Sequence, residues 1–376
     1  MKKIALIGST GSIGRQTLNV VRRHPDKFKI VSLAGGNNVE LLKEQIEEFS
    51  PLVATCALPL RLGGDSKVKT YNGETAYLNA VIEQADVVVV ALVGFMGIHA
   101  VLKALELKKD VALANKESLV VGGKLVMDAV KKAGVNLLPI DSEHSAIWQA
   151  LSQDRNKPFK RIILTASGGA FRDLSVSDLQ FVTAKDALKH PNWNMGDKIT
   201  VDCATMVNKG FEVIEAKWLF NADFDNIDVI IHRESIIHSM VEYLDGSTIA
   251  QMSYPSMELP IALALSYPER IDTGLKGLDF ATLGKLTFAK PDQEKYPCLD
   301  LVIRAGKSGG CLPAVVNGAN EVAVNMFLQG KIKFNDIYKS IAFALDGFSG
   351  SNQVSYENVC LADEYSRKAV KGLFGE

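Results

Sequence analysis

Residues 3–14, with the sequence KIALIGSTGSIG, join a short apolar run to a glycine-rich turn. The run 3–7 has the composition of a buried strand, and a helical stretch begins at residue 14. Gly8, Gly11 and Gly14 have the spacing G-x-x-G-x-x-G, which lets the backbone approach a pyrophosphate held by main-chain N–H groups. This spacing departs from the dinucleotide fingerprint G-x-G-x-x-G, so a turn that only connects strand to helix is the alternative. We favour a dinucleotide-binding turn because it follows the first strand of the chain.

The first 143 residues repeat this alternation of strand and helix, which is typical of βαβ units in a parallel sheet. Apolar, β-branched runs predict strands at 3–7, 28–34, 53–56, 86–93, 110–114 and 135–140. Apolar residues recur at helical spacing in 14–23, 39–49, 97–107 and 123–133. Residues 1–143 therefore predict a Rossmann-like domain whose helices cover the faces of its sheet.

The rest of the chain departs from that alternation. Residues 144–270 mix helical stretches with strand-like runs, which favours a central α+β catalytic domain. Residues 271–297 are rich in glycine, proline and charge and are interpreted as a linker. Residues 298–376 have helical periodicity, which is typical of a small bundle. The predicted fold class is α/β, with an N-terminal Rossmann-like parallel sheet, a central α+β domain and a C-terminal helical bundle.

Composition excludes several classes of protein. The 42 basic and 43 acidic residues give a formal charge of -1, which lacks the positive field that sequence-independent nucleic-acid binding requires. The apolar, uncharged run 87–98 is shorter than the roughly 20 residues that cross a bilayer, and the first apolar run is too short for a signal peptide. The five cysteines are scattered and form no C-x-x-C pair. We therefore expect a cytoplasmic protein with reduced thiols and without a nucleic-acid or membrane partner.

The residues after the second predicted strand bear on the choice of cofactor. An NAD site normally has a carboxylate there to bind the ribose 2′-OH, whereas this chain has Gly36, Asn37 and Asn38. The missing repulsion predicts NADP, although no arginine or lysine stands beside this segment to bind a 2′-phosphate.

Charged residues follow the fifth and sixth predicted strands, at the sheet edge where ligands bind in open α/β folds. Lys116 lies between Asn115 and Glu117 after the fifth strand. Asp141 and Glu143 follow the sixth. A solvated first turn of a helix is an equally ordinary use of residues 115–117.

The acids after the sixth strand are candidate metal ligands. Asp141 and Glu143 are two residues apart, so in a continuing strand both carboxylates project to one face, where a hard divalent cation could bridge them. Glu212 is a candidate third ligand, on a predicted helix face shared with Asn208 and Lys209. Each acid alone is better interpreted as a loop residue or an exposed ion pair, and only the combination predicts a metal site.

A second glycine-rich turn is a candidate anion site. Ser167 opens it directly after a predicted strand, so the turn could offer a hydroxyl and several N–H groups to a phosphate. Asn208 and Lys209 could add an amide and a cation. A purely structural turn is the alternative.

Residues 190–196, HPNWNMG, form a predicted loop with two bulky apolar side chains, Trp193 and Met195. Such a loop suits a lid that excludes water from a hydride transfer. The alternative is a loop that Trp193 anchors to the core.

These motifs resemble those of the 1-deoxy-D-xylulose 5-phosphate reductoisomerases, which depend on NADPH and a divalent metal and act in non-mevalonate isoprenoid synthesis. The likeness spans essentially the whole chain. The matching stretches are 8–14, 114–118 (ANKES), 141–144 (DSEH), 190–193 (HPNW), 204–210 (ATMVNKG), 237–241 (IHSMV) and 312–315 (LPAV).

The resemblance implies a role for each candidate residue. The implied metal is magnesium or manganese, with cobalt as a further candidate. Its implied ligands are Asp141, Glu143 and Glu212. Together with Lys116, these three acids are the implied catalytic residues. The implied substrate contacts are Lys116, Ser142, Glu143, Ser167, His190, Trp193, Cys203, Asn208, Lys209 and Glu212. The implied cofactor contacts are Thr10, Gly11, Ser12, Ile13, Gly36, Asn37, Asn38, Asn115, Glu117, Met195 and Gly196.

The family reaction rearranges the carbon skeleton of a small phosphorylated sugar, usually described as retro-aldol then aldol, and then delivers a hydride to the resulting aldehyde. Its product is 2-C-methyl-D-erythritol 4-phosphate. The resemblance also implies a homodimer that pairs through the middle region.

Two departures from the family pattern are visible, and two other functions are alternatives. Cys203 stands where many members have a serine that bonds the phosphate, and a thiol is a much weaker donor. Residues 232–235, HRES, lack the usual proline after histidine, so we make no prediction for that turn. A semialdehyde dehydrogenase would need Cys203 as its nucleophile, with no base clearly set to activate it. A cofactor-binding sensor would not need three metal ligands.

Overall fold

The computed structural model describes residues 1–64, 66–152, 154, 156–193 and 195–375. The chain forms two compact units. The first comprises Met1–Ser118, Val126–Ser142 and Ser256–Leu275, and the second comprises Leu119–Leu125, Glu143–Pro255 and Lys276–Glu376. Within the described residues, no helix is both long and apolar enough to span a bilayer.

The first unit is built on a seven-stranded sheet in the order β4-β3-β2-β1-β5-β6-β7, with every neighbouring pair parallel. Its strands are β1 (Lys2–Ile7), β2 (Phe28–Ala34), β3 (Val53–Cys56), β4 (Lys69–Asn72), β5 (Val87–Val90), β6 (Asp110–Leu113) and β7 (Leu137–Pro139). The strand order reverses between β1 and β5, which is where ligands bind in doubly wound sheets. The prediction of a Rossmann-like parallel sheet is confirmed.

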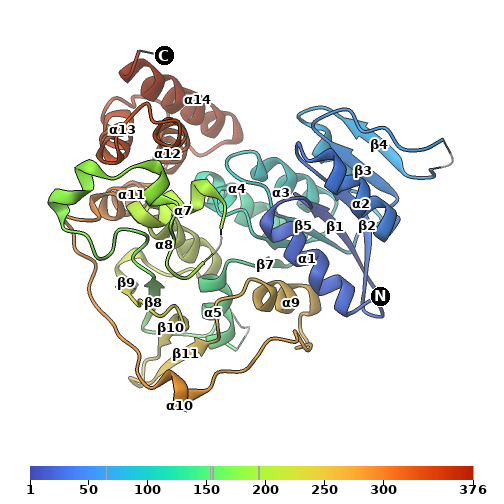
Figure 1. The fold of residues 1–376 in the computed structure, drawn as a ribbon, viewed down its shortest axis with the longest axis horizontal. Helices are drawn as coiled ribbons and strands as arrows, with labels where there is room; N and C mark the ends of the chain where they lie inside the picture. Colours follow the sequence, from blue (N-terminus) through green and yellow to red (C-terminus); the bar gives the residue numbers. More distant parts are fainter. Residues whose placement is uncertain (65, 153, 155, 194, 376) are drawn as a thin grey trace. The chain divides into compact units, whose positions relative to one another are not determined.

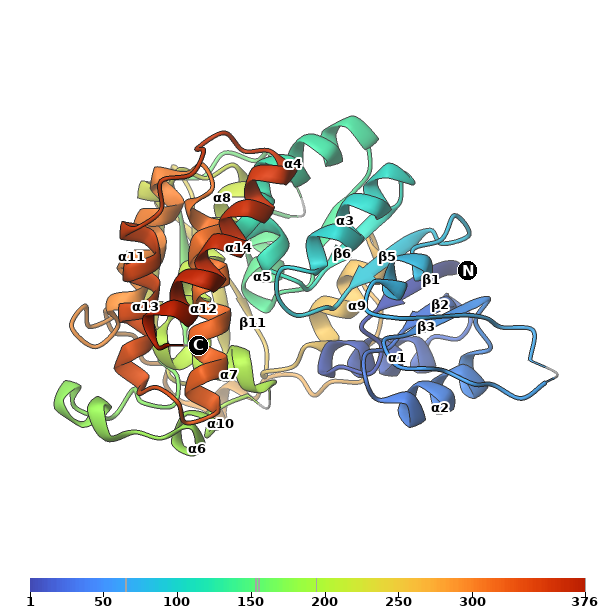
Figure 2. The same ribbon diagram turned by 90° about the horizontal axis from the view of Figure 1, so that it is seen from above.

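Helices cover both faces of this sheet, with α1 and α2 on one face and α3 on the other (Figure 2). α9 packs against α1, where Asn19 donates to Glu258 at 3.1 Å. The helical elements are α1 (Ser12–Arg23), α2 (Val39–Phe49), the 3-10 helix η1 (Ala76–Ala80), α3 (Gly97–Glu106), α4 (Glu117–Ala133) and α9 (Glu258–Ser266). α4 is kinked at Gly122 and begins at Glu117, six residues before the predicted start.

The second unit contains a four-stranded mixed sheet in the order β11-β10-β8-β9, seen in Figure 1. β8 (Arg161–Ala166) pairs parallel with β9 (Ile227–Ile231) and antiparallel with β10 (Ile237–Glu242). β11 (Thr248–Met252) pairs antiparallel with β10 and forms an edge of the sheet. The helical elements around it are α5 (Ser142–Ala150), η2 (Val176–Phe181), α6 (Ala184–Ala187), α7 (Asp197–Thr205), α8 (Val207–Phe220) and η3 (Phe224–Asn226).

The C-terminal helices form the predicted bundle around α12 (Figure 1). α12 is buried on nearly all sides because α11, α13, α14 and α7 pack against it. The helices are α10 (Phe280–Leu283), in the predicted linker, and α11 (Pro297–Ser308), α12 (Leu312–Leu328), α13 (Phe334–Asp346) and α14 (Tyr356–Leu373).

The three-domain division read from the sequence differs from the two units of the structure. Residues 256–275 belong to the first unit because α9 contacts α1, β6 and β7. The bundle belongs with the central α+β region because α11 packs against α8 and α12 packs against α7.

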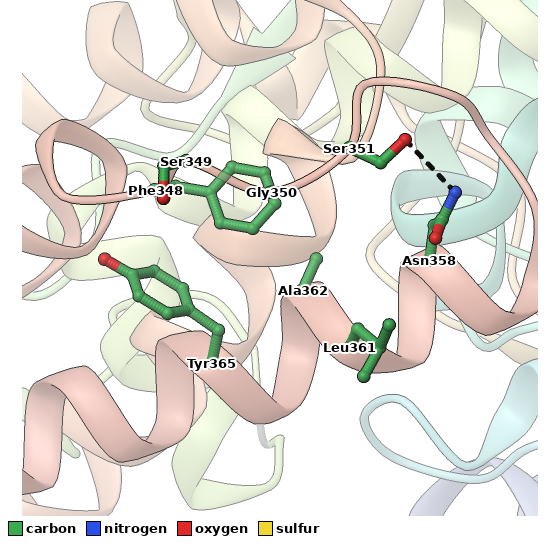
Figure 3. Close-up of a pocket in the computed structure, with 8 residues that line it drawn as sticks. All are labelled: Phe348, Ser349, Gly350, Ser351, Asn358, Leu361, Ala362 and Tyr365. Carbon is green, nitrogen blue, oxygen red and sulfur yellow. Dashed lines mark hydrogen bonds between the residues drawn. The ribbon is translucent and has the colours of Figure 1, made fainter.

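A small hollow lies between α14 and residues 348–351 (Figure 3). The rings of Phe348 and Tyr365 are 5.3 Å apart on one side, and Asn358 donates to Ser351 Oγ at 3.3 Å on the other. The hollow has no charged lining residue, so it offers little to an anion or a metal ion.

Candidate active site

The glycine turn after β1 has the steric features of a nucleotide-binding turn. Gly8 has a φ of +99°, and a Cβ added there would lie 2.5 Å from the carbonyl oxygen of Ala91. A Cβ at Gly14 would lie 2.2 Å from the carbonyl oxygen of Gly8. Gly11 caps α1 without a side-chain hydrogen bond, so the first N–H groups of the helix are left for a ligand. The turn can therefore bind a pyrophosphate through its main chain.

The segment after β2 is exposed and contains no carboxylate. The Gly36 N–H donates to Thr10 Oγ1 at 3.4 Å, which ties this segment to the glycine turn. Asn38 caps α2 by accepting from the Leu41 N–H at 3.1 Å. Asn37 lies between them, so the expected residues lie together and place no negative charge against a 2′-phosphate.

The side chain of Asn115 is used to join the ends of β5 and β6. Its amide donates to the carbonyl oxygens of Leu92 at 3.1 Å and Gly94 at 2.9 Å, and to Glu117 at 2.9 Å. Its oxygen accepts from the Ser118 N–H at 3.0 Å. Asn115 and Glu117 are both buried, so their hydrogen bonds hold this part of the sheet edge in place.

Three carboxylates gather where β7 leads into α5 and against α8. Oxygen atoms of Asp141, Glu143 and Glu212 all lie within 4.8 Å of one another. Asp141 directly precedes α5, Glu143 lies in the first turn of α5, and Glu212 is buried in α8. Two oxygens bound to one Mg²⁺ are at most about 4.2 Å apart, so the three side chains need only small movements to chelate one ion. A set of three carboxylate oxygens fits a hard divalent cation.

Buried lysines neutralise these acids. Lys209 Nζ lies 2.8 Å from Glu143 and also pairs with Glu212, and Lys116 Nζ lies 2.8 Å from Asp141. Burial lowers the pKa of Lys209, but the charges of Glu143 and Glu212 outweigh it, so the net shift is upward. Lys209 is therefore a full cation inside the acidic cluster.

Two further buried residues, His144 and Glu215, lie next to this cluster, and the sequence analysis assigned them no role. His144 Nε2 donates to the carbonyl oxygen of Glu212 at 2.9 Å, and its Nδ1 lies 3.7 Å from Glu215. Both residues are almost fully buried. The signal was present in the sequence, because His144 directly follows Glu143 and Glu215 is one helical turn after Glu212.

The turn after β8 brings Ser167 against the loop 190–193. Ser167 Oγ lies 2.9 Å from His190 Nε2 and accepts from the Gly169 N–H at 3.2 Å. Gly169 has a φ of +70°, and a Cβ there would lie 2.6 Å from the carbonyl oxygen of Cys203. Cys203, at the end of α7, therefore lies beside the turn that was predicted to bind phosphate.

Asn208 and Lys209 lie in the first turn of α8, where Asn208 donates to Glu212 at 2.5 Å. Burial and the positive charge of Arg172 lower the pKa of His190 to about 4, while Glu143 opposes the shift. Glu143 and His190 both belong to the second unit, and the charge of Glu143 acts on the His190 ring.

The loop 190–193 packs against the central sheet. The Trp193 ring lies 6.0 Å from the ring of His238 on β10, and His238 bonds Ser253 Oγ at 3.0 Å. Gly196 caps α7 and follows Met195. Asn194, in the predicted lid, lies outside the described residues. Met195 and Gly196 belong to the second unit, whereas the other expected cofactor contacts belong to the first.

A glycine turn at the reversal of a parallel sheet, with clustered carboxylates and a serine turn, defines a dinucleotide-dependent enzyme with a candidate divalent-metal site. Residues 4–123 match the family described as 1-deoxy-D-xylulose 5-phosphate reductoisomerase, and residues 137–220 match its C-terminal domain. Residues 252–369 match a second description, DXP reductoisomerase C-terminal domain. The chain belongs to the 1-deoxy-D-xylulose 5-phosphate reductoisomerase family.

Individual relatives agree over the full length. The reductoisomerase of Geobacter metallireducens is 49% identical and covers 100% of both chains, and that of Crocosphaera subtropica is 49% identical over 98% of this chain and 96% of its own. The reductoisomerase from Zymomonas mobilis in complex with NADPH has a TM-score of 0.92 and 40% identity, covering 100% of this chain and 99% of that one. A DOX-P reductoisomerase in complex with NADPH, fosmidomycin and magnesium has a TM-score of 0.93 and 38% identity, and the match covers 100% of this chain and 98% of that one. These matches exclude the semialdehyde dehydrogenase interpretation.

Proposed function

We infer that this chain is an NADPH-dependent enzyme that converts 1-deoxy-D-xylulose 5-phosphate to 2-C-methyl-D-erythritol 4-phosphate in the non-mevalonate isoprenoid pathway. Family membership over the full length supports the activity, and a relative bound to NADPH and magnesium supports the cofactors. The observation that carries the inference in this chain is the convergence of carboxylate oxygens from Asp141, Glu143 and Glu212.

These three acids are the proposed ligands of a magnesium or manganese ion. When bound, the ion would act as a Lewis acid on the carbonyl and hydroxyl oxygens of the substrate. Lys116, held by Asp141, supplies a buried cation next to one of those ligands. Its proposed role is to orient the substrate through a charge-assisted hydrogen bond.

Residues at the start of α8 and after β8 are the proposed phosphate site. Ser167 offers a hydroxyl, Asn208 an amide and Lys209 an ammonium group. Lys209 pairs with Glu143 and Glu212, so its ammonium group lies beside two of the proposed metal ligands. The proposed phosphate site and the proposed metal site therefore adjoin at Lys209.

Water exclusion is the proposed task of the loop that carries His190 and Trp193. Trp193 supplies apolar area next to His238, and His190 closes on Ser167. A site closed in this way strengthens the electrostatic contacts inside it and protects the hydride transfer from water.

The assembly and location are also proposals. The edge strand β11 leaves Ile249 45% exposed, which supports a homodimer that pairs through this part of the second unit. Size-exclusion chromatography with light scattering should give a dimer mass, and Ile249→Lys should shift it toward the monomer. The cysteines form no disulfide among the described residues, which supports a reducing compartment such as the cytoplasm.

The decisive assay follows the absorbance of NADPH. Oxidation should require both 1-deoxy-D-xylulose 5-phosphate and Mg²⁺ or Mn²⁺. Turnover that persists after the metal has been removed with a chelator would reject the proposed role of the three acids. No oxidation under any of these conditions would instead favour a cofactor-binding protein without this activity.

A further inference from the structure

Arg172 contacts three separate segments of the second unit, although nothing in the sequence reasoning singled it out. Its Nη1 group lies 3.1 Å from the carbonyl oxygen of Ser167 and 3.3 Å from Asn192 Oδ1 in the loop 190–193. The same group lies 3.0 Å from the carbonyl oxygen of Arg233. The guanidinium group therefore joins three segments: the turn at residues 167–169, called the serine turn, the loop 190–193 and the turn at residues 232–235.

The position of Arg172 is itself fixed. Lys295 Nζ donates to the carbonyl oxygen of Arg172 at 3.1 Å, and Tyr296 OH donates to the carbonyl oxygen of Gly168 at 2.9 Å. A Cβ added at Gly168 would lie 2.9 Å from the Cβ of Arg172, so the arginine packs directly against the turn. The side chain is only 19% exposed, so its hydrogen bonds are partly shielded from water.

The hydrogen bonds of the loop determine the tautomer of His190. Its Nδ1 faces the N–H groups of Asn192 at 3.2 Å and Trp193 at 2.9 Å. A main-chain N–H group can only donate, so Nδ1 is the acceptor and the proton of the neutral ring is on Nε2. Burial and the charge of Arg172 lower the pKa of His190, which keeps the ring neutral near pH 7. His190 Nε2 then donates to Ser167 Oγ.

This tautomer fixes the direction of the Ser167 hydroxyl. Ser167 Oγ accepts from His190 Nε2 at 2.9 Å and from the Gly169 N–H at 3.2 Å, which uses both of its lone pairs. Its own hydrogen is therefore free to donate outward. A phosphate oxygen is a strong acceptor, so the polarity of this hydroxyl matches a phosphorylated ligand.

We propose that Arg172 is a positioning residue that holds the loop 190–193 on the Ser167 turn and so orients the Ser167 hydroxyl as a donor toward the substrate phosphate. This assignment rests on the function proposed above. It gives Arg172 no contact with the ligand. Its effect passes through Asn192, His190 and Ser167.

The test compares Arg172→Gln, Arg172→Lys and the control Arg233→Gln in the full chain. Arg172 bonds the main-chain carbonyl oxygen of Arg233, whereas the Arg233 side chain pairs with the exposed Asp173, so the control removes a neighbouring guanidinium group and keeps that carbonyl acceptor. Three measurements are made: steady-state kinetics give KM and kcat for 1-deoxy-D-xylulose 5-phosphate, calorimetry gives the affinity for inorganic phosphate, and NMR gives the ¹⁵N signals of the His190 ring.

Arg172→Gln should raise KM and weaken phosphate binding by about tenfold, the effect of losing one hydrogen bond to a charged group. The KM for NADPH should not change. The His190 ring should lose its single-tautomer signature in Arg172→Gln and recover part of it in Arg172→Lys. Arg233→Gln should match the wild type in all three measurements.

Phosphate affinity and a His190 signature that are unchanged in folded Arg172→Gln would overturn the proposal. If Arg172→Gln does not fold, Arg172→Lys decides the test. Wild-type phosphate affinity together with an unchanged His190 ring signal in Arg172→Lys would overturn the proposal. An intermediate loss of both would support the proposal. Phosphate binding and the ring signals do not depend on turnover. A wild-type chain that binds phosphate but does not oxidise NADPH would therefore contradict the proposed function without deciding the role of Arg172.

Discussion

The two candidate sites use different parts of the polypeptide. After β1, the nucleotide turn offers main-chain N–H groups, and Gly8 and Gly14 matter because they have no side chain. Around α8, the candidate metal and phosphate groups are buried side chains, among them Glu212 and Lys209. The first site depends on steric fit and the second on charge. Substitutions that change shape and substitutions that change charge should therefore affect the two sites differently.

The largest effect is expected for Glu212→Gln, which keeps the shape of the side chain and removes its charge. Loss of a metal ligand should lower kcat by about 10²–10³-fold, because a bound ion supplies several kcal/mol of transition-state stabilisation. NADPH affinity, measured by fluorescence titration, should stay at the wild-type value. Glu364→Gln is the control, since Glu364 forms an exposed ion pair with Lys368. Near-native turnover of Glu212→Gln would remove Glu212 from the site.

Gly14→Ala tests the main-chain site in the converse way, by changing shape without charge. The added Cβ would lie 2.2 Å from the carbonyl oxygen of Gly8, so the turn has to move and the protein should lose about 1–3 kcal/mol of stability. NADPH affinity should fall while Mn²⁺ affinity is retained. Gly277→Ala is the matched control, because no atom lies within 4 Å of a Cβ at that position. Wild-type NADPH affinity in Gly14→Ala would show that close packing of this turn is unimportant.

His190, which bonds Ser167, should also make the free energy of unfolding depend on pH. Burial, followed by the charge of Arg172, lowers the pKa of His190 to about 4 in the folded chain, against about 6.5 when unfolded. Between these values the unfolded chain binds more protons, so the free energy of unfolding should fall as the pH drops from about 6.5 toward 4. The loss should be about 2 kcal/mol after allowance for partial exposure of the ring.

Urea unfolding of the wild type and of His190→Gln at several pH values measures this contribution. The His190→Gln variant should lose less stability on acidification than the wild type does. Equal slopes in the two proteins would show that His190 does not titrate as its burial predicts.

The smallest effect is expected for Cys203→Ser. A hydroxyl is a better donor than a thiol, so the variant should bind the phosphate more tightly and lower the substrate KM a few-fold, with kcat unchanged. Steady-state kinetics against 1-deoxy-D-xylulose 5-phosphate measure both constants. A KM equal to that of the wild type would indicate that position 203 does not face the phosphate.

Much of the fold could be predicted because hydrophobic periodicity is local. The runs that became β1, β2 and β5 are apolar and buried on both faces, which a single sequence displays directly. β4 was missed because Lys69–Asn72 is a polar, partly exposed edge strand without an apolar run. The packing of α9 on the first unit depends on contacts far apart in sequence, such as Asn19 with Glu258.

The candidate sites divide in the same way. Glycine spacing and paired acids are visible in the sequence, which is why Gly14, Asp141 and Glu143 could be singled out. Arg172 could not, because its role depends on three carbonyl-type oxygens that the fold brings together. The pairing of Lys209 with Glu143 was equally hidden, since the two residues lie on different helices.

Manganese binding tests the central claim most directly. The full chain is titrated with Mn²⁺, and the free ion is followed by electron paramagnetic resonance in the wild type and in Asp141→Asn, Glu143→Gln and Glu212→Gln. We predict that the wild-type chain has a Mn²⁺ site whose affinity each of the three substitutions strongly reduces, while NADPH binding persists. A site that keeps its wild-type affinity in Glu212→Gln would contradict the convergence of the three acids on one ion.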